Sequence, residues 1–274
     1  MSTSSLDFGL QGVHVLITGA SGGIGLVTAQ LFLDLGAHVT AHYNTTPPSL
    51  PSNPNLVPVQ ADVTSESAIT TLFDTATSHS PTKTPPQILI VNHGIFISQN
   101  TSLSAMSLSQ WRQTHAVNLD GSFLLCREFL RRLADQPPHI LESVCITFTG
   151  STAGKFGEAD HADYASSKSA LMYGLTLTLK NEIVRTAPRG RVNAVCPGWV
   201  ATAMAEESLK NEALKARALA STPLQKVAMP KDVAGQIAVV CSPVLSGHVT
   251  GVCIMVDGGM EGRCLYPPPN PATS

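Results

Sequence analysis

The sequence predicts an α/β fold with a single domain, in which strands and helices alternate along the chain and form one open sheet. Two observations lead to this prediction. Short runs of apolar and β-branched residues recur, and most of them are followed by a segment with the apolar spacing of a helix. The chain has 274 residues, which fits one large domain with a complete core. We expect this domain over residues 1–262 and a C-terminal tail over residues 263–274.

The first strand is expected over residues 13–18, and it leads through the turn Gly19-Ala-Ser-Gly-Gly-Ile-Gly25 into an amphipathic helix. A glycine-rich turn between a strand and a helix lets the backbone approach a pyrophosphate, whose charge then meets the helix N-terminus. The spacing here is Gly-x-x-x-Gly-x-Gly rather than the more widespread Gly-x-Gly-x-x-Gly. The stretch favours nucleotide binding over the alternative, a turn that only reverses the chain.

The second strand, over residues 38–43, ends where an NAD-selective site usually places an acid for the ribose 2′-hydroxyl. The residues that follow, Tyr43-Asn-Thr-Thr46, include no carboxylate that would repel a 2′-phosphate. The amide of Asn44 and the neighbouring hydroxyls favour NADP(H), but no arginine is nearby and NAD(H) stays open. The proline-rich connection over residues 47–55 is expected to be a loop without a crossover helix.

A third strand is expected over residues 56–61, ending at Asp62 and Val63, which we count as candidate cofactor-binding residues. Asp62 could accept a hydrogen bond from an adenine amino group. It could instead be the N-cap of the helix expected from about Ser65 to Ser78, and both readings stay open. The next strand, over residues 87–91, is followed by Asn92-His-Gly94 at the end where an open α/β sheet places ligands.

A long helix is expected over residues 107–134, with Asn118 in its middle. Asparagine is not favoured inside helices, because its side chain competes for backbone hydrogen bonds. Asn118 could therefore hold a water molecule, or it could be an exposed polar residue.

The strand over residues 144–149 leads into the segment on which the functional prediction depends. Ser151 follows the strand, and a helix is expected from Ala165 to about Arg185. Tyr164 and Lys168 are four residues apart, so on a helix they share one face. This arrangement supplies a hydroxyl to hold a carbonyl oxygen, a phenol to exchange a proton with it, and an ammonium to make the phenol acidic. The alternative is a core tyrosine beside a solvated lysine.

The expected role of Lys168 is to lower the pKa of Tyr164. A free tyrosine has a pKa near 10, and lowering it by about three units requires about 4 kcal/mol. A unit positive charge about 4 Å away supplies about that much at an effective dielectric constant near 20. A lysine one helical turn away is therefore sufficient in magnitude, and a cationic nicotinamide ring would add to its effect.

The last part of the chain is expected to complete the sheet. A strand over residues 191–196 ends at Pro197-Gly198, and the helix-prone segment 203–226 is a candidate lid beside the strand ends. The uncharged run over residues 233–256 is long enough to raise the question of a membrane span. Polar residues and a Ser-Pro step interrupt it, so helix, turn and strand is the better interpretation.

Composition limits the possible partners and compartments. The net charge of −2 offers no electrostatic attraction for nucleic acid or an anionic membrane. The six cysteines have neither paired nor metal-ligand spacing, so we expect free thiols and no metal site. The N-terminus lacks the basic region and apolar core of a signal peptide, and we expect a cytoplasmic protein.

In this order, the motifs resemble the short-chain dehydrogenase/reductase family in its common form of about 250 residues. The resemblance covers about residues 10–262 and is closest to β-ketoacyl-carrier-protein reductases and fungal-type polyketide ketone reductases, which implies secondary metabolism. It rests on Thr18-Gly-x-x-x-Gly-x-Gly25, Asp62-Val63, Asn92-x-Gly94, Asn118, Ser151, Tyr164-x-x-x-Lys168, Pro197-Gly198 and Thr202.

The resemblance implies a single doubly wound Rossmann domain with a seven-stranded parallel sheet, in a homodimer or homotetramer. Tyr164 would be the general acid or base, Lys168 would lower its pKa and bind the nicotinamide ribose, and Ser151 would polarise the substrate carbonyl. Asn118 would anchor a water in the proton relay. The implied dinucleotide contacts are Gly19, Ser21, Gly23, Ile24, Gly25, Asn92, Val200 and Thr202.

The expected activity is hydride transfer between NADP(H) and a small ketone or aldehyde, or the corresponding secondary alcohol. Two rival functions remain: a biosynthetic isomerase, dehydratase or cyclase that uses the same site, and a dinucleotide-binding sensor without redox chemistry. Two departures from the family pattern also bear on the cofactor. His93 replaces the small residue usual between Asn92 and Gly94, and the basic residue often found in NADP-preferring members is missing.

Overall fold

The computed structural model describes residues 6–260 and Gly262, so the expected tail over 263–274 lies outside the described residues. Seven strands form one sheet in the order β3-β2-β1-β4-β5-β6-β7, and every neighbouring pair is parallel. The expected Rossmann sheet is confirmed. Its strands are β1 (His14–Ile17), β2 (His38–Tyr43), β3 (Leu56–Gln60), β4 (Ile88–Val91), β5 (Cys145–Thr149), β6 (Arg191–Pro197) and β7 (Cys253–Val256).

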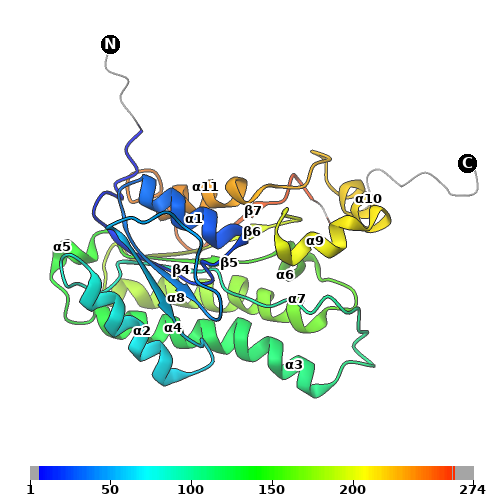
Figure 1. Cartoon of the computed structure of the whole chain (residues 1–274), viewed down its shortest axis with the longest axis horizontal. Coiled ribbons are helices and arrows are strands. Elements are labelled where there is room, and N and C mark those ends of the chain that lie inside the picture. The colour runs from blue at the N-terminus through cyan, green and yellow to red at the C-terminus, as the bar shows by residue number, and fades with distance from the viewer. Residues whose placement is uncertain (1–5, 261, 263–274) are drawn as a thin grey trace, which may run out of the picture.

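Helices cover both faces of the sheet (Figure 1). Helices α1 and α11 pack against each other above it in this view, and α2, α3, α4, α7 and α8 lie below. The helices are α1 (Gly23–Asp34), α2 (Glu66–His79), α3 (Leu108–His115), α4 (Gly121–Leu133), α5 (Pro138–Leu141), α6 (Thr152–Phe156), α7 (Ala162–Ser169), α8 (Thr176–Glu182), α9 (Ala203–Lys210), α10 (Glu212–Ala220) and α11 (Pro230–Cys241).

The central strands are buried along their whole length and mostly apolar, because both faces of the sheet are covered. Every residue of β1, β4, β5 and β6 is buried. Two separate hydrophobic cores result, one on each face. The core with α1 and α11 includes Phe32 and Ile237, and the core with α2 and α4 includes Phe73 and Phe129.

Two long helices predicted from the sequence are interrupted by wider turns. The expected helix over 107–134 consists of α3, the π-helix η1 (Ala116–Asp120) and α4. The helix expected from Ala165 begins at Ala162 and passes through the π-helix η2 (Ala170–Leu175) and α8 to the 3-10 turn η3 (Ile183–Arg185). Single π turns inside α-helices often occur at functional sites, and η1 contains Asn118.

The uncharged run over residues 233–256 folds as most of α11, a turn and β7, which confirms the interpretation as helix, turn and strand. Within the described part of the chain, the helices are too short or too polar to cross a bilayer. All strands run in the same direction, so the carboxyl ends of β1, β4, β5 and β6 lie side by side at the same end of the sheet. The residues that follow these four strands form the candidate site.

Candidate active site

The glycine-rich turn after β1 has a backbone shape that favours glycine. Gly19 and Gly23 have φ angles of +65° and +53°, in the left-handed region. A Cβ atom on Gly25 would lie 2.1 Å from the backbone oxygen of Gly19. The turn leads into the N-terminus of α1, which no side chain caps. Backbone N–H groups and the positive end of the helix dipole are therefore available to an anion, and the turn fits a pyrophosphate.

Other segments lie against this turn. The hydroxyl of Ser21 donates a hydrogen bond of 2.6 Å to the carbonyl oxygen of Thr46. The methyl group of Thr202 is 3.1 Å from the position that a Cβ atom on Gly23 would occupy. Ile24 is half-buried and packs against the core beside α1. The predicted residues of the turn and Thr202 thus lie together.

Two predicted cofactor-binding residues near the ends of β2 and β3, Asn44 and Val63, differ in their exposure to solvent. Asn44 is exposed, and its backbone oxygen accepts a hydrogen bond from the amide of Gln60. Val63 is buried, and its Cγ2 atom is 3.0 Å from where a Cβ atom on Gly121 would lie. The side chain of Val63 therefore packs under α4, and only its backbone is left as a possible contact to a cofactor.

Asp62 does not cap α2. The N-cap of α2 is Ser65, whose hydroxyl accepts a hydrogen bond from the backbone N–H of Ala68. The Oδ1 atom of Asp62 instead accepts hydrogen bonds from the backbone N–H and the hydroxyl of Thr64, at 2.9 and 2.8 Å. These bonds, the backbone one most of all, lower the pKa of the Asp62 carboxyl. The N-cap alternative is therefore wrong, and an exposed carboxylate remains at the end of β3.

Asn92 connects the ends of three strands. Its Nδ2 atom donates hydrogen bonds to the backbone oxygens of Thr18 and Gly19, at 3.1 and 3.2 Å. Its Oδ1 atom accepts a hydrogen bond of 3.2 Å from the hydroxyl of Thr149. The side-chain amide thus holds the glycine-rich turn in place from within the protein.

Ser151, Tyr164 and Lys168 come together as the sequence predicts. Ser151 is the N-cap of α6, its Oγ atom accepts a hydrogen bond from the N–H of Ala153, and it also hydrogen-bonds the phenol of Tyr164. The Nζ atom of Lys168 lies 5.7 Å from the centroid of the Tyr164 ring and donates a hydrogen bond of 2.9 Å to the backbone oxygen of Thr149. Lys168 is only 4% exposed, so the alternative of a solvated lysine is wrong.

The pKa of Tyr164 contradicts the expected lowering. Burial raises the pKa of the phenol above its usual value, the hydrogen bond with Ser151 opposes this rise, and the charge of Glu158 adds to it. Burial also lowers the pKa of Lys168 to about 8. As the pH rises, Lys168 therefore loses its proton before Tyr164 ionises, so the two side chains do not form an ammonium–phenolate pair at equilibrium in the free protein.

Asn118 is completely buried in η1, so the alternative of an exposed polar residue is wrong. Its Oδ1 atom accepts a hydrogen bond of 2.8 Å from the backbone N–H of Ile95. Its Nδ2 atom donates hydrogen bonds to the backbone oxygen of Ile95, at 3.0 Å, and to the hydroxyl of Ser167, at 3.2 Å. The same hydroxyl of Ser167 donates to the backbone oxygen of Tyr164, at 2.8 Å. Asn118 is thereby connected to the helix that carries Tyr164.

The segment after β6 places the last predicted cofactor residues. Val200 is buried and forms a parallel bridge with Ala228. The bridge joins the two segments that precede and follow the candidate lid. The N–H of Thr202 donates to the backbone oxygen of Val200, at 2.8 Å. Helices α9 and α10 follow, as the helix-prone character of residues 203–226 indicates.

The structure adds Phe96 and Ser167 to the site, and no sequence pattern predicts either residue. Phe96 lies edge-on to the ring of Tyr164, with centroids 5.1 Å apart, and 4.4 Å from the ring of His161. A single aromatic residue in a loop has no periodicity that would reveal it. Ser167 lies on the helix between Tyr164 and Lys168, and only the packing against Asn118 shows its importance.

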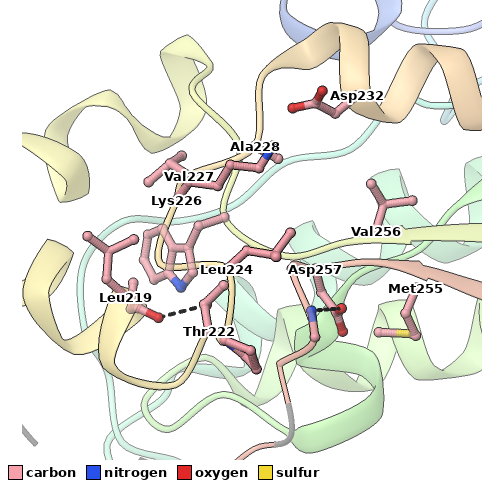
Figure 2. Close-up of a pocket in the computed structure, with 15 residues that line it drawn as sticks. Leu219, Thr222, Leu224, Lys226, Val227, Ala228, Asp232, Met255, Val256 and Asp257 are labelled. Atoms are coloured by element: carbon pink, nitrogen blue, oxygen red, sulfur yellow. Dashed lines mark hydrogen bonds between the residues drawn. The ribbon is translucent and has the colours of Figure 1, made fainter. Parts of the chain in front are cut away.

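A cavity of about 510 Å³ opens at the carboxyl ends of β6 and β7 (Figure 2). It lies between the end of α10, the segment 222–228 and the turn after β7. Trp199, which follows β6, also lines it. Ser151, Tyr164 and Lys168 are not among the described residues that line it. Ser151 follows β5, and β5 pairs with β6, at whose carboxyl end the cavity opens.

The five cysteines that the structure describes are free thiols, and Cys264 lies outside the described residues. Among the described residues, no group of three or more His, Cys, Asp or Glu side chains could hold a metal ion.

Comparison with known proteins places this geometry in a family. Residues 19–261 match the sequence model of the family described as enoyl-(acyl carrier protein) reductase. The chain is 30% identical over 254 residues to a 3-oxoacyl-[acyl-carrier-protein] reductase of Synechocystis, covering 89% of this chain and 95% of the relative. It is also 30% identical over 268 residues to a 3β-hydroxysteroid dehydrogenase of Eggerthella lenta, covering 94% and 96%.

Among solved structures, the chain is similar to a short-chain dehydrogenase/reductase from Brucella melitensis described as a glucose/ribitol dehydrogenase. The TM-score is 0.80 and the identity 30%, over 93% of this chain and 98% of that one. The similarity thus extends over the whole described domain.

Proposed function

The chain belongs to the short-chain dehydrogenase/reductase family and is an NAD(P)-dependent oxidoreductase, and we propose that it transfers a hydride between NADP(H) and a small ketone or aldehyde, or the corresponding secondary alcohol. The observation that carries this proposal is the convergence of three side chains. Ser151 bonds the phenol of Tyr164, and Lys168 lies beneath the same ring in a buried position.

The chemistry that a bound nicotinamide supplies is hydride donation or acceptance. The hydroxyl of Ser151 is placed to hold the carbonyl oxygen of the substrate, and Tyr164 to give that oxygen a proton. The phenol of Tyr164 is protonated at neutral pH, as a proton donor in carbonyl reduction must be. The buried Lys168 ammonium, held by the carbonyl of Thr149, stabilises the negative charge that remains on the phenolate oxygen after transfer.

We propose NADP(H) rather than NAD(H) because the exposed end of β2 carries Asn44 and two threonines and no carboxylate. Asp62 at the end of β3 is the candidate for the adenine amino group, since its carboxylate is exposed. Titration with each cofactor, followed by nucleotide fluorescence, tests the preference. Tighter binding of NADH than of NADPH would overturn it.

We propose that the cavity beside β6 and β7 takes the apolar part of the substrate. Trp199, Leu219 and Met255 supply apolar walls, and the cavity lies beside the strand that leads to Ser151. Trp199→Ala should raise the KM of substrates with a large apolar group by about tenfold and leave the KM of NADPH unchanged. An equal change for small and large substrates would show that the cavity does not contact the substrate.

The central test compares two tyrosines. Tyr164→Phe removes the proton donor, so turnover of NADPH with a generic diketone should fall by a factor of about 10³ or more. Tyr173→Phe is the matched control, because Tyr173 lies nine positions further along the same helix and is 45% exposed. Unchanged turnover in Tyr164→Phe would rule out the proposed mechanism. Product formation without stoichiometric loss of NADPH would identify an isomerase, dehydratase or cyclase instead, and binding without turnover a sensor.

We also propose that the protein acts in the cytoplasm as a homodimer or homotetramer in secondary metabolism. Large apolar side chains on the helices below the sheet support the assembly, since Phe123 of α4 is 47% exposed and Tyr173 of η2 is 45% exposed. Light scattering measures the assembly directly. A monomer at micromolar concentration would contradict it.

A further inference from the structure

His93 has a buried ring with partners on both nitrogen atoms. It is 7% exposed and follows Asn92 at the end of β4. Its Nδ1 atom is 2.9 Å from the hydroxyl oxygen of Thr18, and its Nε2 atom is 3.0 Å from the backbone oxygen of Val117. The ring therefore spans the distance between the end of β1 and the π-helix η1.

The two partners assign the tautomer of His93. A carbonyl oxygen can only accept, so Nε2 carries the proton and donates to Val117. Nδ1 then accepts from the hydroxyl of Thr18, whose one proton is shared with the longer contact of 3.2 Å to the carbonyl oxygen of Ile90. Burial, together with the charges of His42 and Lys168, lowers the pKa of His93 to about 3. The imidazole is therefore neutral at physiological pH and keeps both hydrogen bonds.

Each end of this connection adjoins a part of the candidate active site. Thr18 immediately precedes Gly19, and a Cβ atom on Gly19 would lie 2.9 Å from the Cα atom of His93. Val117 immediately precedes Asn118, whose amide continues through Ser167 to the backbone of Tyr164. One imidazole thus lies between the glycine-rich turn and the hydrogen-bond chain that supports the catalytic helix.

We propose that His93 is a positioning residue that sets Asn118 relative to the glycine-rich turn, through the hydrogen bonds of its ring to Val117 and Thr18. The expected effect of His93 on turnover rests on the proposed reductase function. Its structural part, the fixing of η1, does not depend on that function. The family usually has a small residue at this position. The imidazole of His93 instead forms a hydrogen bond that joins the end of β4 to η1, which a small side chain does not make.

Three variants separate the two bonds. His93→Ala removes both, and His93→Gln can place an amide N–H where Nε2 donates to Val117. The shorter amide of His93→Asn reaches only the Thr18 side. We expect His93→Ala and His93→Asn to lower kcat by about ten- to a hundredfold through misplacement of Asn118, with the KM for NADPH changed less than about threefold. His93→Gln should restore kcat to within about threefold of the wild type.

His14 provides a matched control at the opposite end of β1. Its ring is also buried and also bonds one carbonyl and one threonine hydroxyl, Thr84 at 3.1 Å and Thr40 at 2.9 Å. His14→Ala should lower the melting temperature about as much as His93→Ala and leave kcat unchanged at temperatures where the protein stays folded. An equal loss of kcat in both alanine variants, or an unchanged kcat in His93→Ala, would overturn the proposal.

Hydrogen–deuterium exchange gives a readout that is independent of activity. Peptides covering residues 112–122 should exchange faster in His93→Ala than in the wild type, and not in His14→Ala. If this difference appears while the wild type fails to oxidise NADPH with any carbonyl substrate, the reductase function fails and the positioning role stands. If the wild type turns over and His93→Ala changes neither exchange in these peptides nor kcat, the positioning role fails and the reductase function stands.

Discussion

Two buried ionisable residues, Tyr164 and Lys168, show how desolvation competes with charge at the scale of single residues. A charge pair is strong only when both partners are charged over the same pH range. Because the pKa of Lys168 is lowered to about 8 and that of Tyr164 is raised, the ammonium and the phenolate do not coexist at equilibrium in the free protein. Lys168 can therefore assist Tyr164 only below about pH 8, where it is still charged and the phenol is a proton donor.

For two glycines in helices, Gly25 and Gly235, we expect substitution by alanine to change the free energy of unfolding in opposite directions. A Cβ atom on Gly25 would meet the backbone oxygen of Gly19 at 2.1 Å, whereas a Cβ atom on Gly235 has no atom within 4 Å. Gly25→Ala should therefore lower the free energy of unfolding by about 1–3 kcal/mol and weaken NADPH binding. Gly235→Ala in α11 should raise it by about 0.5–1 kcal/mol. Urea unfolding measures both, and effects of the same sign would contradict the packing.

At the scale of elements, the junction between β3 and α2 separates a structural residue from a candidate binding residue. Ser65 caps α2, so Ser65→Ala should cost about 1 kcal/mol of stability and leave the Kd of NADPH unchanged. The carboxylate of Asp62 accepts hydrogen bonds from Thr64 in its own turn, so Asp62→Ala should weaken NADPH binding more than it lowers stability. Urea unfolding and fluorescence titration of both variants test this. The reverse pattern would remove Asp62 from the adenine site.

The elements predicted correctly from the sequence are those with a strong local pattern. Strand β2 has the predicted bounds, and the other strands lie within about two residues of them, because apolar runs between turns have few alternatives. The short helices α5 and α6 were not predicted, since four or five residues show no apolar period. The π-helix η1 was also not predicted. Its Asn118 is hydrogen-bonded to Ile95, which lies in a loop distant in the sequence, and local sequence patterns do not encode such a contact.

Within the candidate site, the sequence predicted the residues better than their surroundings. Ser151, Tyr164 and Lys168 were found because their spacing has a chemical meaning. The burial that raises the pKa of Tyr164 depends on loops such as the one with Phe96, whose packing no spacing encodes. Val63 was predicted to contact the cofactor, but its side chain is buried against α4.

At the scale of the whole molecule, the site lies where the strand order reverses. The chain moves outward from β1 to β3 and then returns to place β4 on the other side of β1. The helices that follow β1 and β4 lie on opposite faces of the sheet (Figure 1), the arrangement at which open α/β sheets bind ligands. The glycine-rich turn follows β1 and Asn92 follows β4, so the topology itself brings these two segments together.

The same architecture buries histidines in the sheet and so makes the molecule sensitive to acid. Burial lowers the pKa of His14 to about 4 and that of His93 to about 3, from a usual 6.5. The folded protein therefore binds fewer protons than the unfolded chain below pH 6.5, and stability is complete above that pH and lost as the pH falls toward 4. Each histidine should cost about 1.4 kcal/mol per pH unit in this range.

We accordingly expect the free energy of unfolding to fall by about 3 kcal/mol between pH 7.5 and pH 5.5. Urea unfolding followed by tryptophan fluorescence measures this difference. His14→Gln should reduce the difference by about 1.4 kcal/mol, because this ring no longer titrates in the unfolded chain. A fall of less than about 1 kcal/mol in the wild type would mean that the buried rings accept protons without unfolding.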